Sequence, residues 1–322
     1  MKVLITGGAG YLGSVLARFL INQGDQVRVL DKLMYGGAPI IPLMAEPRFE
    51  FVRGDIVSES TVASTVAGMD AVVHLAAIVG DPACARDLDL ARRTNIEGAL
   101  NIYEQAKAAA VGRFIFASTC SNYGRMNTAD DFLTEDAPLR PVSFYAESKV
   151  EIEKHILKDS DTCLHPLILR FATLYGLSPR MRFDLTVNEF TADLAKNNTL
   201  RVYGEQFWRP YVHVRDAAMA VIASLAASPG AIAQNVYNVG DSQQNFRKQD
   251  LIEMIREYIP NSKVEYVSRQ EDPRDYRVSF DKIMNCLGFK VKNTVRDGIG
   301  EIIRAVKSDV YGDIMSDCYR NC

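Results

Sequence analysis

Three side chains in the middle of the chain have the types and spacing that redox chemistry on an alcohol requires. Tyr145 and Lys149 are four residues apart in a predicted helix that begins after Ser143, so they lie on one face. A neighbouring ammonium favours the phenolate form of a tyrosine, which can take the proton of a hydroxyl group while hydride leaves the same carbon. Thr119 can hydrogen-bond to the reacting oxygen. The spacing alone equally fits an exposed Tyr/Lys pair without a catalytic role.

The first thirteen residues predict the partner that would accept the hydride. An apolar run at 3–5 predicts a strand, the glycines Gly7, Gly10 and Gly13 follow it, and a helical pattern begins at residue 14. Glycine permits a positive φ and removes the Cβ that would keep a pyrophosphate away from the backbone. The unpaired N–H groups at the start of the helix then face the phosphates. This stretch therefore predicts a dinucleotide-binding turn.

Asp31 ends the next predicted strand, 18 residues beyond Gly13. A carboxylate at this position can accept hydrogen bonds from both ribose hydroxyls of an adenosine and repels a 2′-phosphate. The acid therefore favours NAD over NADP, although the neighbouring Lys32 weakens that preference. The competing interpretation is an ordinary βαβ unit with an exposed acid.

Strands and helices alternate along the first half of the chain, and the strands are uniformly apolar. This pattern implies a parallel sheet with helices on both faces. Hydroxyl groups crowd the end of a central strand at 118–123, where open α/β sheets bind ligands. Further strands are predicted at 49–56, 71–77 and 113–117, helices at 58–68 and 88–110, a loop at 78–86, and a turn at 228–230.

The composition is that of an ordinary soluble globular enzyme. The 322 residues are 48% hydrophobic and 24% charged with a net charge of −3, which gives no basic surface for nucleic acid or anionic membranes. No apolar stretch is long enough to span a bilayer, and we expect no signal peptide. The six cysteines are scattered without a C-x-x-C pair, so we expect neither a metal site nor disulfides, and a cytoplasmic location.

These motifs occur together and in one order, which is more specific than any of them alone. The set resembles the extended short-chain dehydrogenase/reductase family, the group of nucleotide-sugar epimerases, dehydratases and reductases. The resemblance covers nearly the whole chain and continues through 209–216, 237–240 and 269–276. The motifs that carry it are the glycine turn, Asp31, Asp55, Leu75-Ala76-Ala77, Ser118-Thr119, Tyr145 with Lys149, and Arg170.

The resemblance implies a fold and a division of the chain. The expected fold is a Rossmann-type, doubly wound parallel sheet with a smaller carboxyl-terminal α+β lobe. Residues 1–176 would form the NAD-binding domain, to which 212–242 return, and 177–322 would form the lobe that binds a nucleotide sugar. The segment after residue 306 is polar and is expected to be mobile. By analogy with the family we expect a homodimer formed through two helices that flank the sheet.

The resemblance also implies roles for individual residues, at the positions where this sequence matches the family motifs. Thr119, Tyr145 and Lys149 would be catalytic. Tyr145 and Lys149 would also contact NAD, with Lys149 holding the nicotinamide ribose. The remaining NAD contacts would come from Gly7, Gly10, Tyr11, Leu12, Gly13, Asp31, Lys32, Asp55, Ile56, Leu75, Ala76, Ala77, Asn95 and Phe171. The substrate contacts would come from Val79, Thr119, Cys120, Ser121, Thr173, Asn188, Val202, Arg209 and Arg269.

Departures from the family pattern narrow the reaction. The related dehydratases carry an aspartate and a glutamate directly after the threonine, where this chain has Cys120 and Ser121. Sugar-acid decarboxylases tend to carry glutamate at the position of Ser121. We therefore expect an NAD-dependent nucleotide-sugar epimerase that works by transient oxidation. The alternatives are a ketosugar reductase that consumes NAD(P)H and a non-catalytic NAD-binding sensor, which would have a broken Tyr/Lys/Thr set.

Overall fold

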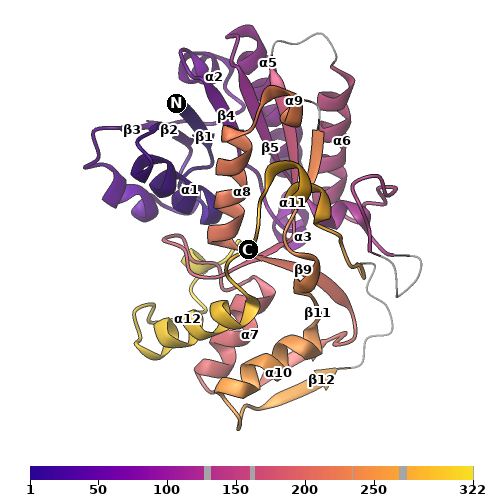
Figure 1. The fold of residues 1–322 in the computed structure, drawn as a ribbon. Helices are drawn as coiled ribbons and strands as arrows, with labels where there is room; N and C mark the ends of the chain where they lie inside the picture. Colours follow the sequence, from indigo (N-terminus) through magenta and orange to yellow (C-terminus); the bar gives the residue numbers. More distant parts are fainter. Residues whose placement is uncertain (127–131, 160–163, 234, 268–273, 322) are drawn as a thin grey trace.

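A seven-stranded parallel sheet forms the centre of the computed structural model, which describes residues 1–126, 132–159, 164–233, 235–267 and 274–321 (Figure 1). The strand order is β10–β6–β5–β4–β1–β2–β3, and all six neighbouring pairs are parallel. This arrangement confirms the predicted Rossmann-type fold. The strands are β1 Lys2–Thr6, β2 Gln26–Asp31, β3 Phe49–Arg53, β4 Ala71–His74, β5 Arg113–Thr119, β6 His165–Phe171 and β10 Asn235–Val239.

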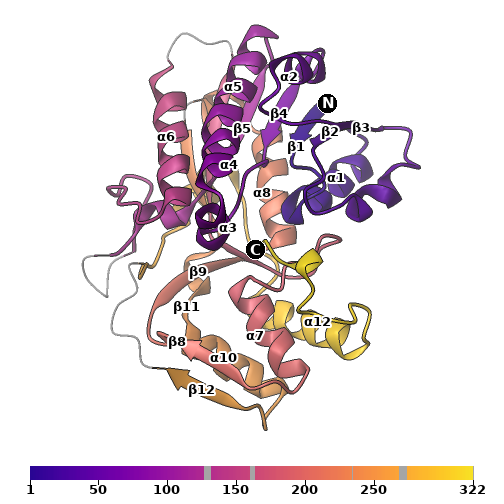
Figure 2. The same cartoon turned by 180° about the vertical axis from the view of Figure 1, so that it is seen from behind.

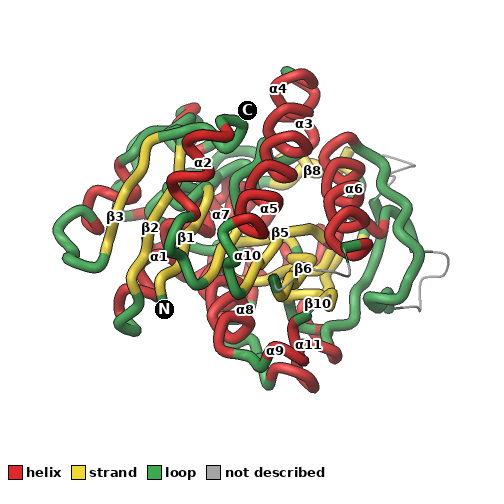
Figure 3. Tube along the Cα trace, turned by 90° about the horizontal axis from the view of Figure 1, so that it is seen from above, coloured by secondary structure: helices red, strands yellow, loops and turns green. Residues whose placement is uncertain are grey.

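Helices cover both faces of this sheet, as the uniformly apolar strands predict (Figure 3). In β1, Val3 and Ile5 belong to one buried cluster and Leu4 to the other, so alternate side chains of one strand serve two cores. One face packs on α1 Tyr11–Asn22 and α8 Val214–Ala226, and the other on α2 Glu59–Val66, α5 Ala99–Ala108 and α6 Phe144–Lys158.

The chain order changes direction at β1. From this strand the chain proceeds to β2 and β3 on one side, and then returns to β4 and β5 on the other. The connections after β1 and β4 therefore diverge at the carboxyl edge of the sheet and leave a crevice there, which is the ligand position in open α/β sheets.

The second lobe lies beyond this edge and is drawn below the sheet in Figures 1 and 2. It contains two small sheets and three longer helices. One sheet is formed by β7 Thr173–Tyr175, β9 Trp208–His213 and β11 Asn245–Arg247, and the other by β8 Leu200–Tyr203 and β12 Val264–Val267. The helices are α7 Thr186–Ala195, α10 Lys248–Tyr258 and α12 Val295–Lys307, while α11 Asp281–Leu287 lies beside β10.

Three local predictions are wrong. The predicted loop at 78–86 contains helix α3 Asp81–Arg86, which begins after Gly80 at a φ of +100°. The predicted long helix at 88–110 is instead α4 Leu88–Arg92, a π-helical turn Arg93–Gly98, and α5. A short helix α9, Pro229–Ile232, also replaces the predicted turn at 228–230.

The segment after α12 is folded, which corrects the expectation that it is mobile. Tyr311 and Tyr319 pack edge-on against each other and against Phe183, with ring centroids 5.1 to 5.6 Å apart. The Phe183 amide also donates to the Tyr319 carbonyl at 2.9 Å. These contacts return the chain to the junction between the lobes, where Figure 1 marks its carboxyl end. We call residues 308–321 the tail.

Among the described residues, no helix has the length and apolar character needed to cross a bilayer. The same residues contain no cluster of three or more histidine, cysteine or acidic side chains able to hold a metal ion. The cysteines whose state is described, Cys84, Cys120, Cys286 and Cys318, are free thiols.

Candidate functional site

A cavity of about 540 Å³ lies between the carboxyl edge of the sheet and the second lobe. This volume is in the range of sites for small molecules and cofactors. Most of the predicted site residues line it: Gly7, Gly10, Tyr11, Leu12, Gly13, Asp31, Lys32, Asp55, Ile56, Leu75, Ala76, Ala77, Val79, Thr119, Ser121, Tyr145, Lys149, Phe171, Thr173 and Arg209.

The glycine turn has the shape that a dinucleotide requires. Gly7 has a φ of +72°, and a Cβ there would lie 2.8 Å from the backbone of Ala76, two residues after β4. Gly10 precedes the first residue of α1 in an extended conformation and has no side chain to cap the helix. The first N–H groups of α1 therefore face the cavity and can bind phosphate oxygens.

Asp31 lies at the end of β2, and each oxygen of its carboxylate accepts a backbone hydrogen bond. One oxygen accepts a hydrogen bond from Ala9 N at 3.0 Å and the other from Leu33 N at 2.8 Å. Burial raises the pKa of Asp31, and the two backbone hydrogen bonds oppose that rise. Lys32 Nζ lies 3.2 Å from the carboxylate of Asp55, so the lysine is paired with an acid of the chain itself.

Thr119, Tyr145 and Lys149 approach the cavity from two neighbouring elements. Thr119 is the last residue of β5, and its Oγ1 accepts a hydrogen bond from Ser121 N at 3.1 Å, so the hydroxyl proton can point elsewhere. Ser143 caps α6, as predicted, by accepting from Ala146 N. One turn into α6, Lys149 Nζ lies 6.0 Å from the centre of the Tyr145 ring and 4.7 Å from that of Phe116.

The electrostatics of this pair differ from the sequence-based expectation. Burial raises the pKa of Tyr145 above its ordinary value, and the charge that most opposes this rise is the Arg182 guanidinium. Burial also lowers the pKa of Lys149 to about 8, while Cys84 and Glu153 oppose that shift. In the protein alone Tyr145 is therefore a neutral phenol, and positive charge from a bound ligand is needed to favour its phenolate.

A buried ion pair fixes α6 against the sheet. The carboxylate of Glu153, one turn beyond Lys149, lies 2.6 Å from Arg170 Nη2 of β6, and both side chains are almost fully buried. Glu153 also accepts from Ser118 and from Asn122 Nδ2 at 2.9 Å. Ser118 and Asn122 lie on either side of Thr119 in the chain. The Glu153 carboxylate therefore positions both the Thr119 hydroxyl and the face of α6 that carries Tyr145 and Lys149. No sequence motif marks this glutamate, since its partners Ser118, Asn122 and Arg170 lie 17 to 35 residues away in the chain.

The second lobe contributes cations to the far wall of the cavity. The Arg209 guanidinium lies 5.4 Å from the centre of the Tyr276 ring, and the Tyr276 hydroxyl lies 3.4 Å from Ser121 Oγ. Arg274 Nη1 donates to the carboxylate of Asp81 at 2.9 Å. Lining residues that the sequence analysis missed include Tyr35, Asp81, Arg180, Arg182, Asp184, Lys248, Arg274, Tyr276 and Asn321.

Four predicted contacts lie away from the cavity lining. The Asn95 amide bonds to both backbone groups of Ile78 and thereby holds the loop after β4. Cys120 is buried and donates to the Arg170 carbonyl. Val202 is buried in β8. Asn188 is fully buried, and its side chain bonds to Gly176 N, the Tyr11 hydroxyl and the Arg182 carbonyl. Arg269 lies outside the described residues.

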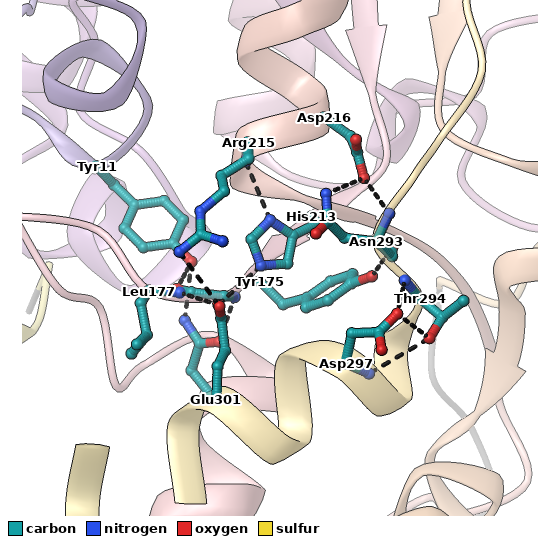
Figure 4. Close-up of polar contacts among 12 residues, drawn as sticks. Tyr11, Tyr175, Leu177, His213, Arg215, Asp216, Asn293, Thr294, Asp297 and Glu301 are labelled. Carbon is teal, nitrogen blue, oxygen red and sulfur yellow. Dashed lines mark hydrogen bonds and ion pairs between the residues drawn. The ribbon is translucent and has the colours of Figure 1, made fainter. Parts of the chain in front are cut away.

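The two lobes are joined directly at the start of the cofactor helix (Figure 4). The Tyr11 hydroxyl donates to the Gly176 carbonyl and accepts from Asn188 Nδ2 at 3.1 Å. Next to it, the carboxylate of Glu301 in α12 accepts from Leu177 N at 2.7 Å and lies 2.8 Å from His213 Nε2. The first residue of α1 is therefore part of a buried polar network of the second lobe.

Comparison with known proteins assigns the chain to a family. Residues 3–240 match the model of the NAD-dependent epimerase/dehydratase family. A dTDP-glucose 4,6-dehydratase from Actinoplanes is 31% identical over 326 residues, which covers 94% of this chain and 97% of the relative.

Solved structures show the same fold over almost the whole length. The dTDP-glucose 4,6-dehydratase DesIV from Streptomyces venezuelae, solved with NAD bound, has a TM-score of 0.85 at 29% identity and covers 96% of this chain and 98% of its own. The UDP-glucose 4-epimerase of Thermus thermophilus in complex with NAD has a TM-score of 0.83 at 26% identity, with coverages of 96% and 100%. The chain therefore belongs to the NAD-dependent epimerase/dehydratase family, and its cofactor is NAD.

Proposed function

We propose that the chain is an NAD-dependent nucleotide-sugar epimerase that transiently oxidises one sugar hydroxyl to a ketone. The observation that carries this proposal is the turn Cys120–Tyr123, which follows Thr119 at the cavity and contains no carboxylate. Eliminating water from a sugar needs an acid and a base beside the reacting carbons, in addition to a hydride acceptor. The side chains at this turn are instead a buried thiol, a hydroxyl, a buried amide and a buried phenol.

The proposed chemistry needs three protein groups. Tyr145 takes the proton from the sugar hydroxyl as hydride leaves the same carbon, and it later returns the proton to the ketone oxygen. Thr119 donates a hydrogen bond to that oxygen, and the Lys149 ammonium stabilises the phenolate of Tyr145. NAD, which the glycine turn and Asp31 would hold, would supply the hydride acceptor for the oxidation and the hydride for the reduction.

The charge on the second-lobe wall supports a substrate with a diphosphate. Asp184 of this wall and Asp81 of helix α3, across the cavity, are each paired with an arginine of the wall, at 2.6 and 2.9 Å. This wall suits a dianionic group because it presents several guanidinium groups, and each planar guanidinium matches phosphate oxygens with two hydrogen bonds. Its cationic side chains are Arg180, Arg182, Arg209, Lys248 and Arg274.

The test is incubation of the purified protein with a panel of nucleotide sugars, without added reductant, followed by chromatography and mass spectrometry. An epimerase gives a product of unchanged mass and needs no stoichiometric cofactor. A product lighter by one water would identify a dehydratase and refute the proposal. A strict requirement for stoichiometric NADH or NADPH would identify the alternative ketosugar reductase.

A further inference from the structure

A buried arginine of the second lobe lines the cavity without a carboxylate at ion-pair distance among the residues that the structure describes. Arg180 is 3% exposed, and its two Nη atoms donate to the carbonyls of Met181 at 3.2 Å and Arg320 at 2.8 Å. Its Nε is buried and has no partner in the same described part of the chain. Carbonyl groups orient the guanidinium but do not neutralise its charge, so the side chain is suited to an anionic ligand.

The position of Arg180 favours the cofactor over the substrate as the source of that anion. The guanidinium carbon lies 4.3 Å from the centre of the Tyr35 ring, in the loop that follows Asp31. Arg180 N bonds to Ser178 Oγ at 3.3 Å, and Ser178 Oγ donates to the carbonyl of Tyr11 at 2.7 Å. The arginine is therefore tied both to the loop beside the ribose-binding acid and to the first turn of the phosphate-binding helix. A dinucleotide bound here would have its diphosphate at the N-terminus of this helix and its adenosine ribose at Asp31.

We propose that Arg180 is a cofactor-retaining residue whose guanidinium pairs with the diphosphate of NAD from the second-lobe side. The glycine turn and α1 bind this diphosphate from one side, and Arg180 covers it from the other. The release of NAD then requires the Arg180 guanidinium and the Tyr35 ring to move apart. This inference depends on NAD being the cofactor and does not depend on the epimerase reaction, because binding and release need no turnover.

The tail orients the guanidinium of Arg180. Arg320 presents its carbonyl to Arg180, while Asn321 N donates to the carboxylate of Asp184 at 3.2 Å. That carboxylate forms a two-pronged ion pair with Arg182, at 2.6 and 3.0 Å, so its direct partner is Arg182 and not Arg180. The guanidinium of Arg180 is therefore held in one direction before the ligand binds. Less conformational entropy of this side chain is lost on binding as a result.

The experiment measures the exchange of bound NAD for isotopically labelled NAD in the holoenzyme, together with the affinity of the holoenzyme for UDP. In Arg180→Met we expect NAD exchange to accelerate by about tenfold or more, since a buried charge-assisted contact is lost. The affinity for UDP should stay within about twofold of wild type. The matched control is Arg201→Met, which removes an exposed arginine paired with Glu265 outside the cavity and should change neither quantity.

Two further variants keep the test decisive if Arg180→Met folds poorly. Arg180→Lys retains the charge without the planar fork, and Tyr35→Leu removes the stacking ring but leaves the arginine. Both should accelerate NAD exchange by less than Arg180→Met does. Unchanged exchange in all three variants would overturn the proposal. A loss of UDP affinity with unchanged NAD exchange would also overturn it, by assigning the guanidinium to the diphosphate of the substrate.

Discussion

The carboxylate of Asp81 accepts a hydrogen bond from Arg274 across the cavity at 2.9 Å, joining helix α3 of the NAD-binding region to the second lobe. The two side chains are 33% and 40% exposed, so the pair is worth at most about 1 kcal/mol. A dianionic diphosphate is a stronger partner for Arg274 than a single exposed carboxylate, and we expect substrate to compete with Asp81 for the arginine.

Asp81→Asn should therefore lower the KM for the nucleotide sugar by up to about fivefold, corresponding to about 1 kcal/mol, with kcat unchanged. Steady-state kinetics would measure both parameters, and Asp89→Asn in the exposed part of α4 is the control. A large fall in kcat instead would mean that Asp81 contacts the reacting sugar.

Tyr145→Phe should reduce kcat by about 10²- to 10⁴-fold, because it removes the only proposed proton acceptor for the sugar hydroxyl. The ring remains in place, so the NAD content of the purified variant should match that of wild type. Tyr266→Phe, which changes an exposed phenol on β12, should leave both quantities unchanged. Near-normal turnover of Tyr145→Phe would contradict the proposed chemistry.

Asp31→Ala should weaken NAD binding and reduce the preference for NAD over NADP. The substitution removes the acceptor for the ribose hydroxyls and also leaves Ala9 N and Leu33 N without their side-chain partner. Dissociation constants for the two cofactors would show the change in their ratio. An unaltered ratio would mean that another group sets the preference.

Glu153→Gln should lower the free energy of unfolding by about 3 kcal/mol, because Arg170 would remain buried without its counter-charge. Urea denaturation measures this loss, and Glu151→Gln on the exposed face of the same helix is the matched control. A loss below about 1 kcal/mol would contradict this role of the ion pair.

Lys149 should make stability depend on pH in the alkaline range. Burial lowers its pKa to about 8 in the folded protein, whereas an unfolded lysine titrates near 10.4. Between these values the unfolded state binds more protons, so the free energy of unfolding rises with pH by up to about 1.4 kcal/mol per unit. Denaturation of wild type and Lys149→Met from pH 7 to 10 would isolate this contribution as a growing difference in favour of wild type. A constant difference would refute the shift.

The sequence predicted those parts of the fold and site that depend on neighbouring residues. The glycine turn, Asp31 and the helix that begins after Ser143 follow from local backbone geometry and periodicity, and the structure has them at the cavity. The parallel sheet followed from the uniformly apolar strands, because burial on both faces removes the alternation of polar residues.

Contacts between distant segments could not be predicted in the same way. Arg180 is oriented by a carbonyl 140 residues later in the chain, and Asp81 pairs with an arginine 193 residues away. A single arginine in a loop has no periodicity that reveals which wall it faces. Asn188 illustrates the converse, since a family position expected at the substrate is occupied here by internal hydrogen bonds.

The hydrogen bonds of Tyr11 have a consequence for protein engineering. Because the first residue of α1 bonds to Gly176 and Asn188, the second lobe cannot be exchanged for that of a relative as an independent module. A chimaera that replaces the second lobe must also match position 11 to the residue that takes the place of Asn188. A mismatch there would weaken cofactor binding even though every residue of the glycine turn had been kept.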